Sequence, residues 1–364
     1  MGKSRRNPLC PSVPPSEAIG VLDFFSGCGG TSAGLHAAGL QILAGIDCDP
    51  AASATYRLNF PNSDFLEVDI RTAETTALDD AARRTPAGLV ISACAPCQPY
   101  STMRRGGRST SPDRSLLLTL IPFIERLQPD AILVENVPGM QKIPGASTWN
   151  RFRRALHRMG YSMTWEVVDC RTYGVPQRRR RLVLLASRHG PIALPEPTHG
   201  PGRLPYSTIR EWIEDLPPLE AGDIDPNDTN HRAAGLGDLN MRRIKALKEG
   251  GSRSDWPDEL WLDCHRKNQG HEDVYGRMKF DSYAPVLTTK CTDITNGRFG
   301  HPVQNRAISV REAASIQTFP RSFSFTGGIR SSTRQVGNAV PVLLAQRLGE
   351  HIIQHLRSVE SESL

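Results

Sequence analysis

Residues 93–101 read Ala-Cys-Ala-Pro-Cys-Gln-Pro-Tyr-Ser, and they continue a short apolar run, Leu89–Ile91, that begins after Gly88. Such a run is typical of a parallel strand that is buried on both faces. The strand must end at Pro96, because proline cannot donate to a sheet ladder. This pattern places Cys97 at the carboxyl edge of a parallel sheet, where open α/β proteins bind their ligands.

Cys97 has several competing interpretations. Together with Cys94 it forms a C-x-x-C pair, which is the spacing of a dithiol redox site or of half a zinc site. The other six of the eight cysteines supply no second closely spaced pair, which disfavours zinc. A redox site would need its first cysteine exposed at a helix start, whereas Cys94 still belongs to the apolar run. On local evidence alone, a structural and a catalytic cysteine both remain open.

The composition is that of an ordinary globular protein with a basic surplus. At 364 residues the chain can build one large domain and a smaller one, and its formal net charge of +6 favours a polyanionic partner. No apolar stretch approaches the roughly 20 residues that cross a bilayer, and the polar N-terminus has no apolar core of a secretory signal. We therefore expect a cytoplasmic protein with reduced cysteines and no membrane partner.

The first ordered segment has the pattern of a βαβ unit. Ile19–Phe25 reads as a strand, Ser26–Thr31 as a tight turn and Ser32–Ala38 as a helix. Leu40–Ile46 is a second strand, and Asp47 follows it where nucleotide-binding α/β folds place a carboxylate for ribose hydroxyls. The same pattern fits a nicotinamide dehydrogenase, although Ser32 stands where the third glycine of G-x-G-x-x-G would be.

Two later segments bring polar groups to the same region. Ala131–Val134 predicts a buried strand that delivers Glu135 to the sheet edge, where the carboxylate is either a turn cap or a catalytic group. Residues 178–181 are four consecutive arginines. Side chains alternate in an extended segment, so Arg179 and Arg181 share one face with Gln177.

Basic residues are also concentrated elsewhere. The loop 102–114 is either a solvated surface loop or a mobile flap whose arginines meet phosphate. Leu116–Leu127, Arg151–Arg158 and Leu239–Lys248 have the spacing of helices, and the last two are basic. From about residue 187 the sequence becomes rich in proline and glycine. Cys264, His265 and His271 there lack a fourth ligand, so we expect no metal site.

Pro96–Ser101 resembles the active-site motif of the DNA cytosine-C5 methyltransferases, and further motifs of that family follow in the family's order. These motifs are Asp23–Gly30, Glu135–Val137, Gln177–Arg181, Arg306–Pro320 and Gln335–Pro341. The resemblance extends from Val21 to about Leu356, apart from the recognition segment. It favours S-adenosylmethionine over a nicotinamide cofactor and a catalytic role for Cys97 over a structural one.

The resemblance implies a Rossmann-like, S-adenosylmethionine-dependent methyltransferase fold of the α/β class. A mostly parallel sheet flanked by helices would carry a smaller, irregular target recognition domain. We expect a disordered basic tail over 1–17 and a catalytic cofactor-binding domain over 18–186. A recognition domain follows over 187–320, and its variable part lies at about 187–283. A C-terminal segment and helix over 321–357 would return to the catalytic domain, and residues 358–364 would form a tail.

The resemblance also implies roles for single residues. The catalytic group is Cys97, Glu135, Arg179 and Arg181. The cofactor-binding group is Phe25, Ser26, Gly27, Cys28, Gly29, Gly30, Asp47, Cys48, Asp69, Ile70, Pro96, Asn338 and Ala339, in which Phe25 stacks on the adenine and Asp47 takes the ribose. The substrate-binding group is Gln98, Ser101, Arg104, Arg105 and Gln177.

The implied activity is methylation of cytosine C5 in a specific sequence of double-stranded DNA. The target base would be flipped out, Cys97 would bond to C6, and S-adenosylmethionine would supply the methyl group without a metal. A monomer in the prokaryotic cytoplasm, associated with the nucleoid when bound to DNA, would suffice, either solitary or paired with a restriction endonuclease for the same site. The alternatives are a tRNA cytosine-C5 methyltransferase and a catalytically inactive DNA-binding homologue.

Overall fold

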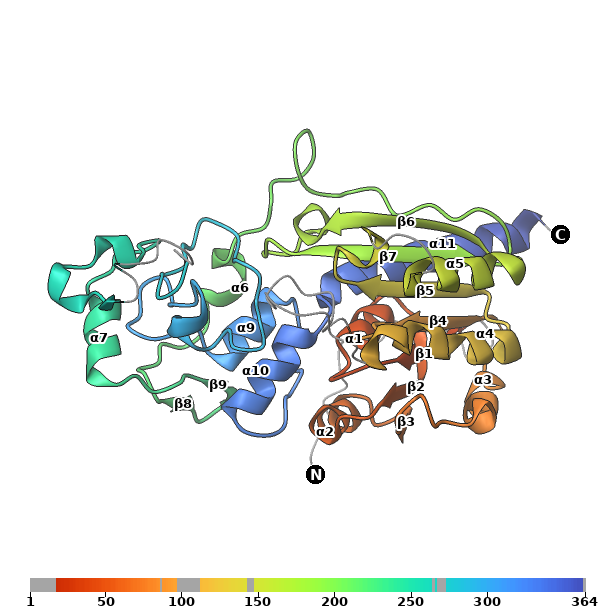
Figure 1. Cartoon of the computed structure of the whole chain (residues 1–364), viewed down its shortest axis with the longest axis horizontal. Helices are drawn as coiled ribbons and strands as arrows, with labels where there is room; N and C mark the ends of the chain where they lie inside the picture. The colour runs from red at the N-terminus through yellow and green to blue at the C-terminus, as the bar shows by residue number, and fades with distance from the viewer. Residues whose placement is uncertain are drawn as a thin grey trace, which may run out of the picture. The chain divides into compact units, whose positions relative to one another are not determined.

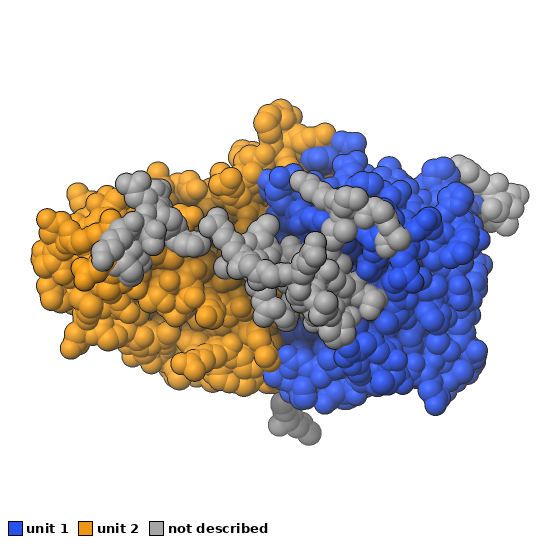
Figure 2. All heavy atoms as spheres, viewed as in Figure 1, with its two compact units in different colours: residues 1–169, 180–197, 340–364 blue, residues 170–179, 198–339 orange. Residues whose placement is uncertain are grey.

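The computed structural model describes residues 18–85, 87–96, 112–142, 147–263, 266 and 273–362. The chain divides into two compact units, coloured separately in Figure 2. Unit 1 comprises Met1–Asp169, Arg180–Pro197 and Val340–Leu364, and unit 2 comprises Cys170–Arg179 and Thr198–Ala339. The predicted limits of the functional domains remain a prediction, and the predicted tail over 1–17 lies outside the described residues.

Unit 1 is built on a seven-stranded sheet with the strand order β3-β2-β1-β4-β5-β7-β6 (Figure 1). Of these strands β7 alone is antiparallel to its neighbours, β5 and β6. The bounds are β1 (Gly20–Phe24), β2 (Gln41–Asp47), β3 (Asp64–Glu67), β4 (Leu89–Ala93), β5 (Ala131–Asn136), β6 (Ser162–Asp169) and β7 (Arg180–Ser187). The predicted α/β fold with a mostly parallel sheet is therefore confirmed.

The central strands are buried throughout, as the short apolar runs predicted. Every residue of β1, β4 and β5 is buried. The flanking elements of unit 1 are α1 (Gly30–Ala37), α2 (Pro50–Asn59), η2 (Thr75–Leu78), α3 (Asp79–Ala82), η4 (Pro112–Leu120), α4 (Ile121–Leu127), η5 (Met140–Lys142), α5 (Thr148–Arg158) and α11 (Val342–Glu362). Helices on this sheet bury both of its faces, and the carboxyl edge remains for chemistry.

The predicted helix over 116–127 differs from the structure. Its first part belongs to the 3₁₀ element η4, and the α-helix α4 begins only at Ile121. Pro122 lies in the first turn of α4. Proline has no backbone N–H to donate to the preceding turn, so an α-helix starts readily beside it but does not run through it.

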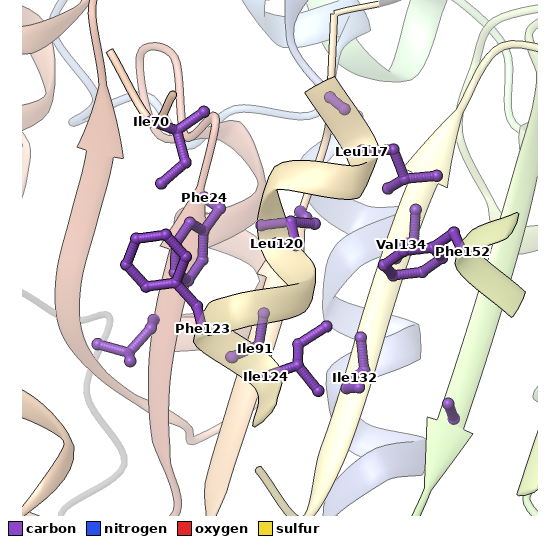
Figure 3. Close-up of a cluster of buried hydrophobic side chains, with 14 of the residues drawn as sticks. Phe24, Ile70, Ile91, Leu117, Leu120, Phe123, Ile124, Ile132, Val134 and Phe152 are labelled. Carbon is purple, nitrogen blue, oxygen red and sulfur yellow. The ribbon is translucent and has the colours of Figure 1, made fainter. Parts of the chain in front are cut away.

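One face of the sheet is covered by η4, α4 and α5. Figure 3 shows Leu120, Phe123 and Ile124 directed at side chains of the strands, among them Phe24 and Ile132. The rings of Phe24 and Phe123 meet edge to face with centroids 5.2 Å apart. Each fully buried side chain of this size stabilises the fold by about 1.5–3 kcal/mol, so this layer holds the strand ends in place.

The helices α1 and α11 pack together although they lie at opposite ends of the chain. Gly34 makes this possible, because a Cβ there would lie 2.3 Å from the carbonyl oxygen of Val342. Leu344, Leu348 and Ile352 of α11 are buried. The C-terminal helix α11 therefore packs within unit 1, and the predicted limits 321–357 of the returning segment remain a prediction.

Unit 2 has little regular structure. Its elements are η6 (Cys170–Tyr173), α6 (Arg210–Ile213), β8 (Ile224–Asp225), β9 (Asp228–Arg232), α7 (Asp238–Lys245), η7 (Arg253–Asp255), η8 (Asp258–Leu260), η9 (Ile294–Asn296), α9 (Val310–Ile316) and α10 (Ile329–Asn338). The motif Gln335–Pro341 begins within α10, which ends at Asn338. The helix α11 starts after Pro341, because proline cannot supply the N–H that would continue one helix into the next.

Candidate active site

The loop between β1 and α1 has an unusual backbone. Phe25, Gly27 and Gly29 have φ angles of 55°, 54° and 96°, in the left-handed region. At Gly29 a Cβ would lie 2.5 Å from Cε2 of Phe60, so only glycine fits. Phe25 adopts this conformation without being a glycine, and strain of this kind is concentrated at functional sites.

Asp47, at the end of β2, holds this loop. Its Oδ2 accepts a hydrogen bond of 2.8 Å from the backbone N–H of Gly27, and its Oδ1 accepts one of 2.9 Å from that of Asp49. Burial raises the pKa of Asp47 above its ordinary value. Each carboxylate oxygen has two lone pairs, so the side chain can fix the loop and still accept hydroxyl groups of a ligand.

Other predicted cofactor residues of unit 1 differ in how far they are buried. Ser26 and Cys28 are buried, and burial raises the pKa of the Cys28 thiol to about 12, which keeps it protonated. Cys48 is exposed. Ile70 is buried, whereas the Asp69 carboxylate is hydrogen-bonded by Arg71, which lowers the pKa of Asp69. An aromatic ring, a carboxylate and a glycine turn suit an adenosine group.

A buried polar network under the loop was missed by sequence reasoning. Asp23 is fully buried within β1, and its Oδ2 accepts a hydrogen bond of 2.6 Å from the Ser32 hydroxyl. The Ser32 hydroxyl is also 2.9 Å from the hydroxyl of Tyr56. Burial raises the pKa of Asp23 to about 7. An aspartate inside the apolar run Val21–Phe25 was the available signal, because a buried carboxylate needs partners.

The chain that leads toward Cys97 is fixed by β5. The side-chain amide of Asn136 donates a hydrogen bond of 3.0 Å to the carbonyl oxygen of Ala95. Pro96 is exposed and is the last described residue before the gap. The predicted residues Cys97, Gln98, Ser101, Arg104 and Arg105 lie outside the described residues.

Cys94, the other cysteine of the C-x-x-C pair, is a poor nucleophile. Its Sγ is 3.4 Å from Oγ1 of Thr31. Burial, followed by the nearby carboxylate of Glu135, raises the pKa of Cys94 well above its ordinary value. A thiol must ionise before it can attack, so this environment disfavours Cys94 as a nucleophile.

Glu135 and Arg181 form a buried ion pair in unit 1. Nε of Arg181 is 2.5 Å from Oε1 of Glu135, and the side chains are 12% and 9% exposed. The pairing of β5 with β7 places Glu135 directly opposite Val183, two residues from Arg181. The two side chains are therefore diagonal neighbours on one face of the sheet.

Arg179 has different surroundings, within unit 2. Its guanidinium donates to the carbonyl oxygens of Leu287, Gly337 and Ala339 at 3.1–3.2 Å. Gln177 is also buried there, and its Oε1 accepts from the backbone N–H of Leu287 at 2.9 Å. The structure thus shows both side chains joining segments of unit 2, and their predicted contacts with the base remain a prediction.

Asn338 and Ala339 end unit 2, and they differ in exposure. The side chain of Asn338 is exposed and Ala339 is buried. Their predicted contact with the cofactor remains a prediction. Among the described residues no group of three or more His, Cys, Asp or Glu side chains is arranged to hold a metal ion.

The sequence was compared with known proteins. The profile of the C-5 cytosine-specific DNA methylase family matches residues 19–354. The chain belongs to the C-5 cytosine-specific DNA methylase family. It is therefore a DNA (cytosine-5-)-methyltransferase, and this family depends on S-adenosylmethionine.

Two curated relatives support this C-5 cytosine-specific DNA methylase assignment along nearly the whole chain. The Type II methylase M.HgiDII of Herpetosiphon aurantiacus is 40% identical over 345 residues, which are 93% of this chain and 96% of that protein. The Type II methyltransferase M1.HphI of Haemophilus parahaemolyticus is 32% identical over 340 residues, with 93% and 87% covered. These matches confirm the predicted relation to prokaryotic restriction-modification methyltransferases.

The fold of this DNA methylase is shared with solved structures. A candidate DNA modification methyltransferase encoded within a prophage of E. coli matches with a TM-score of 0.74 and 20% identity, covering 93% of this chain and 100% of that one. DNMT2 of Spodoptera frugiperda matches with a TM-score of 0.61 and 19% identity, covering 94% and 99%. Within the described part of the chain, no helix combines the length and apolar character needed to cross a membrane.

Proposed function

We propose that this methyltransferase modifies C5 of a flipped-out cytosine in a specific sequence of double-stranded DNA, with Cys97 as the nucleophile. One observation carries the proposal. The ion pair of Glu135 and Arg181 lies at the end of β5, and the next residue, Asn136, holds the segment that runs into Cys97. In this proposal an acid, a cation and a nucleophile would act together at one edge of the sheet.

The chemistry requires such a group of residues. C5 of cytosine is a weak nucleophile because its electrons belong to an aromatic ring. The thiolate of Cys97 forms a bond to C6, and the displaced electron pair makes C5 nucleophilic. After C5 has gained the methyl group, it loses its proton, the bond from sulfur to C6 breaks and the thiolate leaves.

Glu135 and Arg181 would act on the polar edge of the base. Glu135 in its protonated form donates a hydrogen bond to the ring nitrogen N3, and this stabilises the negative charge that arrives there when sulfur attacks C6. Arg181 holds the carbonyl oxygen at C2 and orients the Glu135 carboxylate. The ion pair costs no rearrangement at the moment of reaction, because both side chains are already packed together.

S-adenosylmethionine, when bound, supplies the methyl group as an electrophilic sulfonium substituent. The residues that would hold it are those of the strained loop and the neighbouring strand ends. Phe25 packs on the adenine, the backbone of Gly27 and Gly29 approaches the methionine end, and Asp47 accepts the ribose hydroxyls. The hydrogen bond from the N–H of Gly27 to Asp47 supports this proposal, because it couples the loop to the carboxylate that would bind the ribose.

The DNA would be held by basic segments and read by unit 2. Extracting a base costs a few kcal/mol, and contacts from Arg104 and Arg105 to phosphate would offset that cost. We also propose that the enzyme acts as a monomer in the cytoplasm, on the nucleoid. Its relation to Type II methyltransferases adds a restriction endonuclease for the same site as a partner.

A methyl-transfer assay tests the proposal. The purified protein is incubated with labelled S-adenosylmethionine and either mixed-sequence duplex DNA or total tRNA, and modified cytosines are mapped by bisulfite sequencing. We expect label in DNA within one short motif. Label in tRNA alone would overturn the substrate and leave the chemistry. Label in neither would favour the inactive DNA-binding homologue.

A further inference from the structure

The helix α5 carries a row of exposed arginines in unit 1. Arg151, Arg154 and Arg158 are all exposed and are three and four residues apart, so they share one side of the helix. His157 is exposed next to them, and Arg153 is half-buried on the neighbouring side. In Figure 1, α5 lies along the outside of the sheet beside α4.

A groove runs along each side of this helix. One has a volume of about 680 Å³, and its polar lining includes Asn150 and Arg153. The other has a volume of about 640 Å³ and is lined by Arg151 and Arg158 among others. Arg154 and His157 line both grooves, and no carboxylate of a described residue lines either. We call this helix face with its two grooves the α5 surface.

Among the described residues, these arginines have no acidic partner. Residues 147–165 contain no Asp or Glu. Within the described residues, none of the ion pairs includes an arginine of α5, and Arg153 instead stacks over the ring of Trp165 at 5.0 Å. Some exposed arginines elsewhere in unit 1 do have carboxylate partners: Arg83 pairs with Asp80, Arg84 with Asp64, and Arg126 with Asp79.

The arrangement does not serve the stability of α5. Cations in the last turn of a helix are favourable, but near the first turn they oppose the helix dipole. Arg151 is the fourth residue of α5, and no acidic residue is present in its first turn. Unpaired cations at both ends of one helix point to an anionic ligand.

The first groove of the α5 surface also lies away from Glu135. Ser162 and Met163, which line the first groove, pair with Ser187 and Ala186. Ser187 pairs in turn with Ala131, at the start of β5, whereas Glu135 pairs with Val183. Four residues of strand span about 13 Å, so this groove lies near the opposite end of the strands from Glu135.

We propose that the α5 surface binds the sugar-phosphate backbone of DNA outside the catalytic site. This inference rests on the proposed DNA substrate. Guanidinium groups bind phosphate oxygens in a bidentate manner. Arg151 and Arg158 are about 10 Å apart along the helix axis, which corresponds to about three phosphates of one strand. Such a surface holds the enzyme on non-specific DNA while it searches for its site.

Charge-removal variants test the proposal in the full-length enzyme. The first set is Arg151→Gln, Arg154→Gln and Arg158→Gln together. The matched control is Arg83→Gln, Arg84→Gln and Arg126→Gln, which removes the same number of charges from ion-paired positions. Affinity for a long mixed-sequence duplex is measured across salt concentrations. Each lost phosphate contact should flatten the slope of log affinity against log salt by about 0.9.

We expect the first set to flatten that slope by about 2–3 and to weaken binding at least tenfold at low salt, with the control unchanged. The methylation rate at saturating DNA should remain within about twofold, because the surface lies apart from Glu135. The single variant Arg154→Gln affects both grooves and keeps the test possible if the triple variant does not fold. It should change the slope by about 0.9.

Three results would overturn the proposal. Equal slopes for the wild type and the first set would show that no phosphate is bound there. If the control variant flattened the slope of log affinity against log salt equally, the effect would come from net charge and not from this surface. Unchanged DNA binding with lost retention on polyglutamate would assign the surface to an acidic protein. The DNA-binding slope does not depend on methyl transfer, so an enzyme that methylates only tRNA would refute the proposed function without deciding this test.

Discussion

Glu135 of β5 and Arg181 of β7 are diagonal neighbours across an antiparallel strand pair, and their side chains meet at 2.5 Å in a buried position. The two residues are 46 positions apart in the sequence, and the antiparallel pairing of β7 with β5 brings their side chains together. Removing one member of a buried pair leaves the other uncompensated, at a cost of about 3–5 kcal/mol. The pair therefore acts as one unit.

We expect Glu135→Gln to lower the rate of methyl transfer by about 10²–10⁴. The amide still accepts a hydrogen bond from Arg181, but it carries no charge and cannot exchange a proton with the base. Single-turnover rates with saturating DNA and S-adenosylmethionine measure the effect. Glu166→Gln is the matched control, because Glu166 is exposed and level with Glu135 in the sheet register. Equal losses in both variants would remove Glu135 from the mechanism.

Arg181→Lys should reduce kcat/KM for DNA by tenfold or more. Lysine retains the charge but loses the planar fork that holds both a carboxylate and a carbonyl oxygen, and a hydrogen bond to a charged group contributes about 1.5–3 kcal/mol. The neighbouring Arg180→Lys should change little, because Arg180 is exposed. Steady-state kinetics with both variants decide this, and a fully active Arg181→Lys enzyme would contradict the proposed contact with the base.

The two cysteines of the C-x-x-C pair should respond in opposite ways to substitution by serine. Cys97→Ser is expected to abolish methyl transfer. Cys94→Ser should retain it within about tenfold, because the raised pKa keeps the Cys94 thiol neutral and a hydroxyl can replace it beside Thr31. Denaturing gels with DNA that contains 5-fluorocytosine report the covalent adduct, since fluorine cannot leave C5. An adduct that persists in Cys97→Ser would identify another nucleophile.

Asp23 should make folding stability depend on pH. Its pKa is 3.8 in the unfolded chain and about 7 in the fold, so the folded state binds the proton more tightly. The stabilisation is complete below about pH 4 and is lost as the pH rises through 7, and the change is on the order of 4 kcal/mol. Asp23→Asn lacks this loss, so its urea midpoint should gain on the wild type between pH 4 and 8. Asp80→Asn, at an exposed position, should show no such gain.

Gly29→Ala should lower the affinity for S-adenosylmethionine at least tenfold. Both Gly29 and Gly190 have positive φ, so alanine strains either position by about 1–2 kcal/mol. The added methyl group meets Phe60 at Gly29, whereas no atom lies within 4 Å at Gly190. Isothermal titration should therefore separate Gly29→Ala from Gly190→Ala. Comparable affinities would show that the shape of the loop does not control cofactor binding.

The sequence was sufficient for features that depend on local pattern. Short apolar runs such as Leu89–Ile91 predicted buried strands, and β4 and β5 are buried along their whole length. The alternation over Gln177–Arg181 predicted that Arg179 and Arg181 share a face, but their partners differ: Arg179 contacts backbone carbonyls of unit 2 and Arg181 contacts Glu135. Partners are set by tertiary packing, which alternation does not encode.

Other features were beyond pattern analysis for physical reasons. The hydrogen bond from Ser32 to Asp23 joins residues on either side of the loop between β1 and α1. In the sequence, Ser32 stands out only because it occupies the position of the third glycine of G-x-G-x-x-G. The change from η4 to α4 depends on one missing N–H at Pro122, a detail that apolar spacing does not register. The unpaired cations of α5 emerged only when the carboxylates that pair the other arginines were placed.

The close approach of α1 and α11 through Gly34 also has a consequence for biosynthesis. Ribosomes make α1 before α11, with all of unit 2 in between. A nascent chain that has not yet emerged beyond Ala339 leaves the Gly34 side of α1 without its covering helix. Unit 1 is therefore completed only after unit 2 has been synthesised. Prematurely terminated chains expose that apolar face of α1 to cellular proteases.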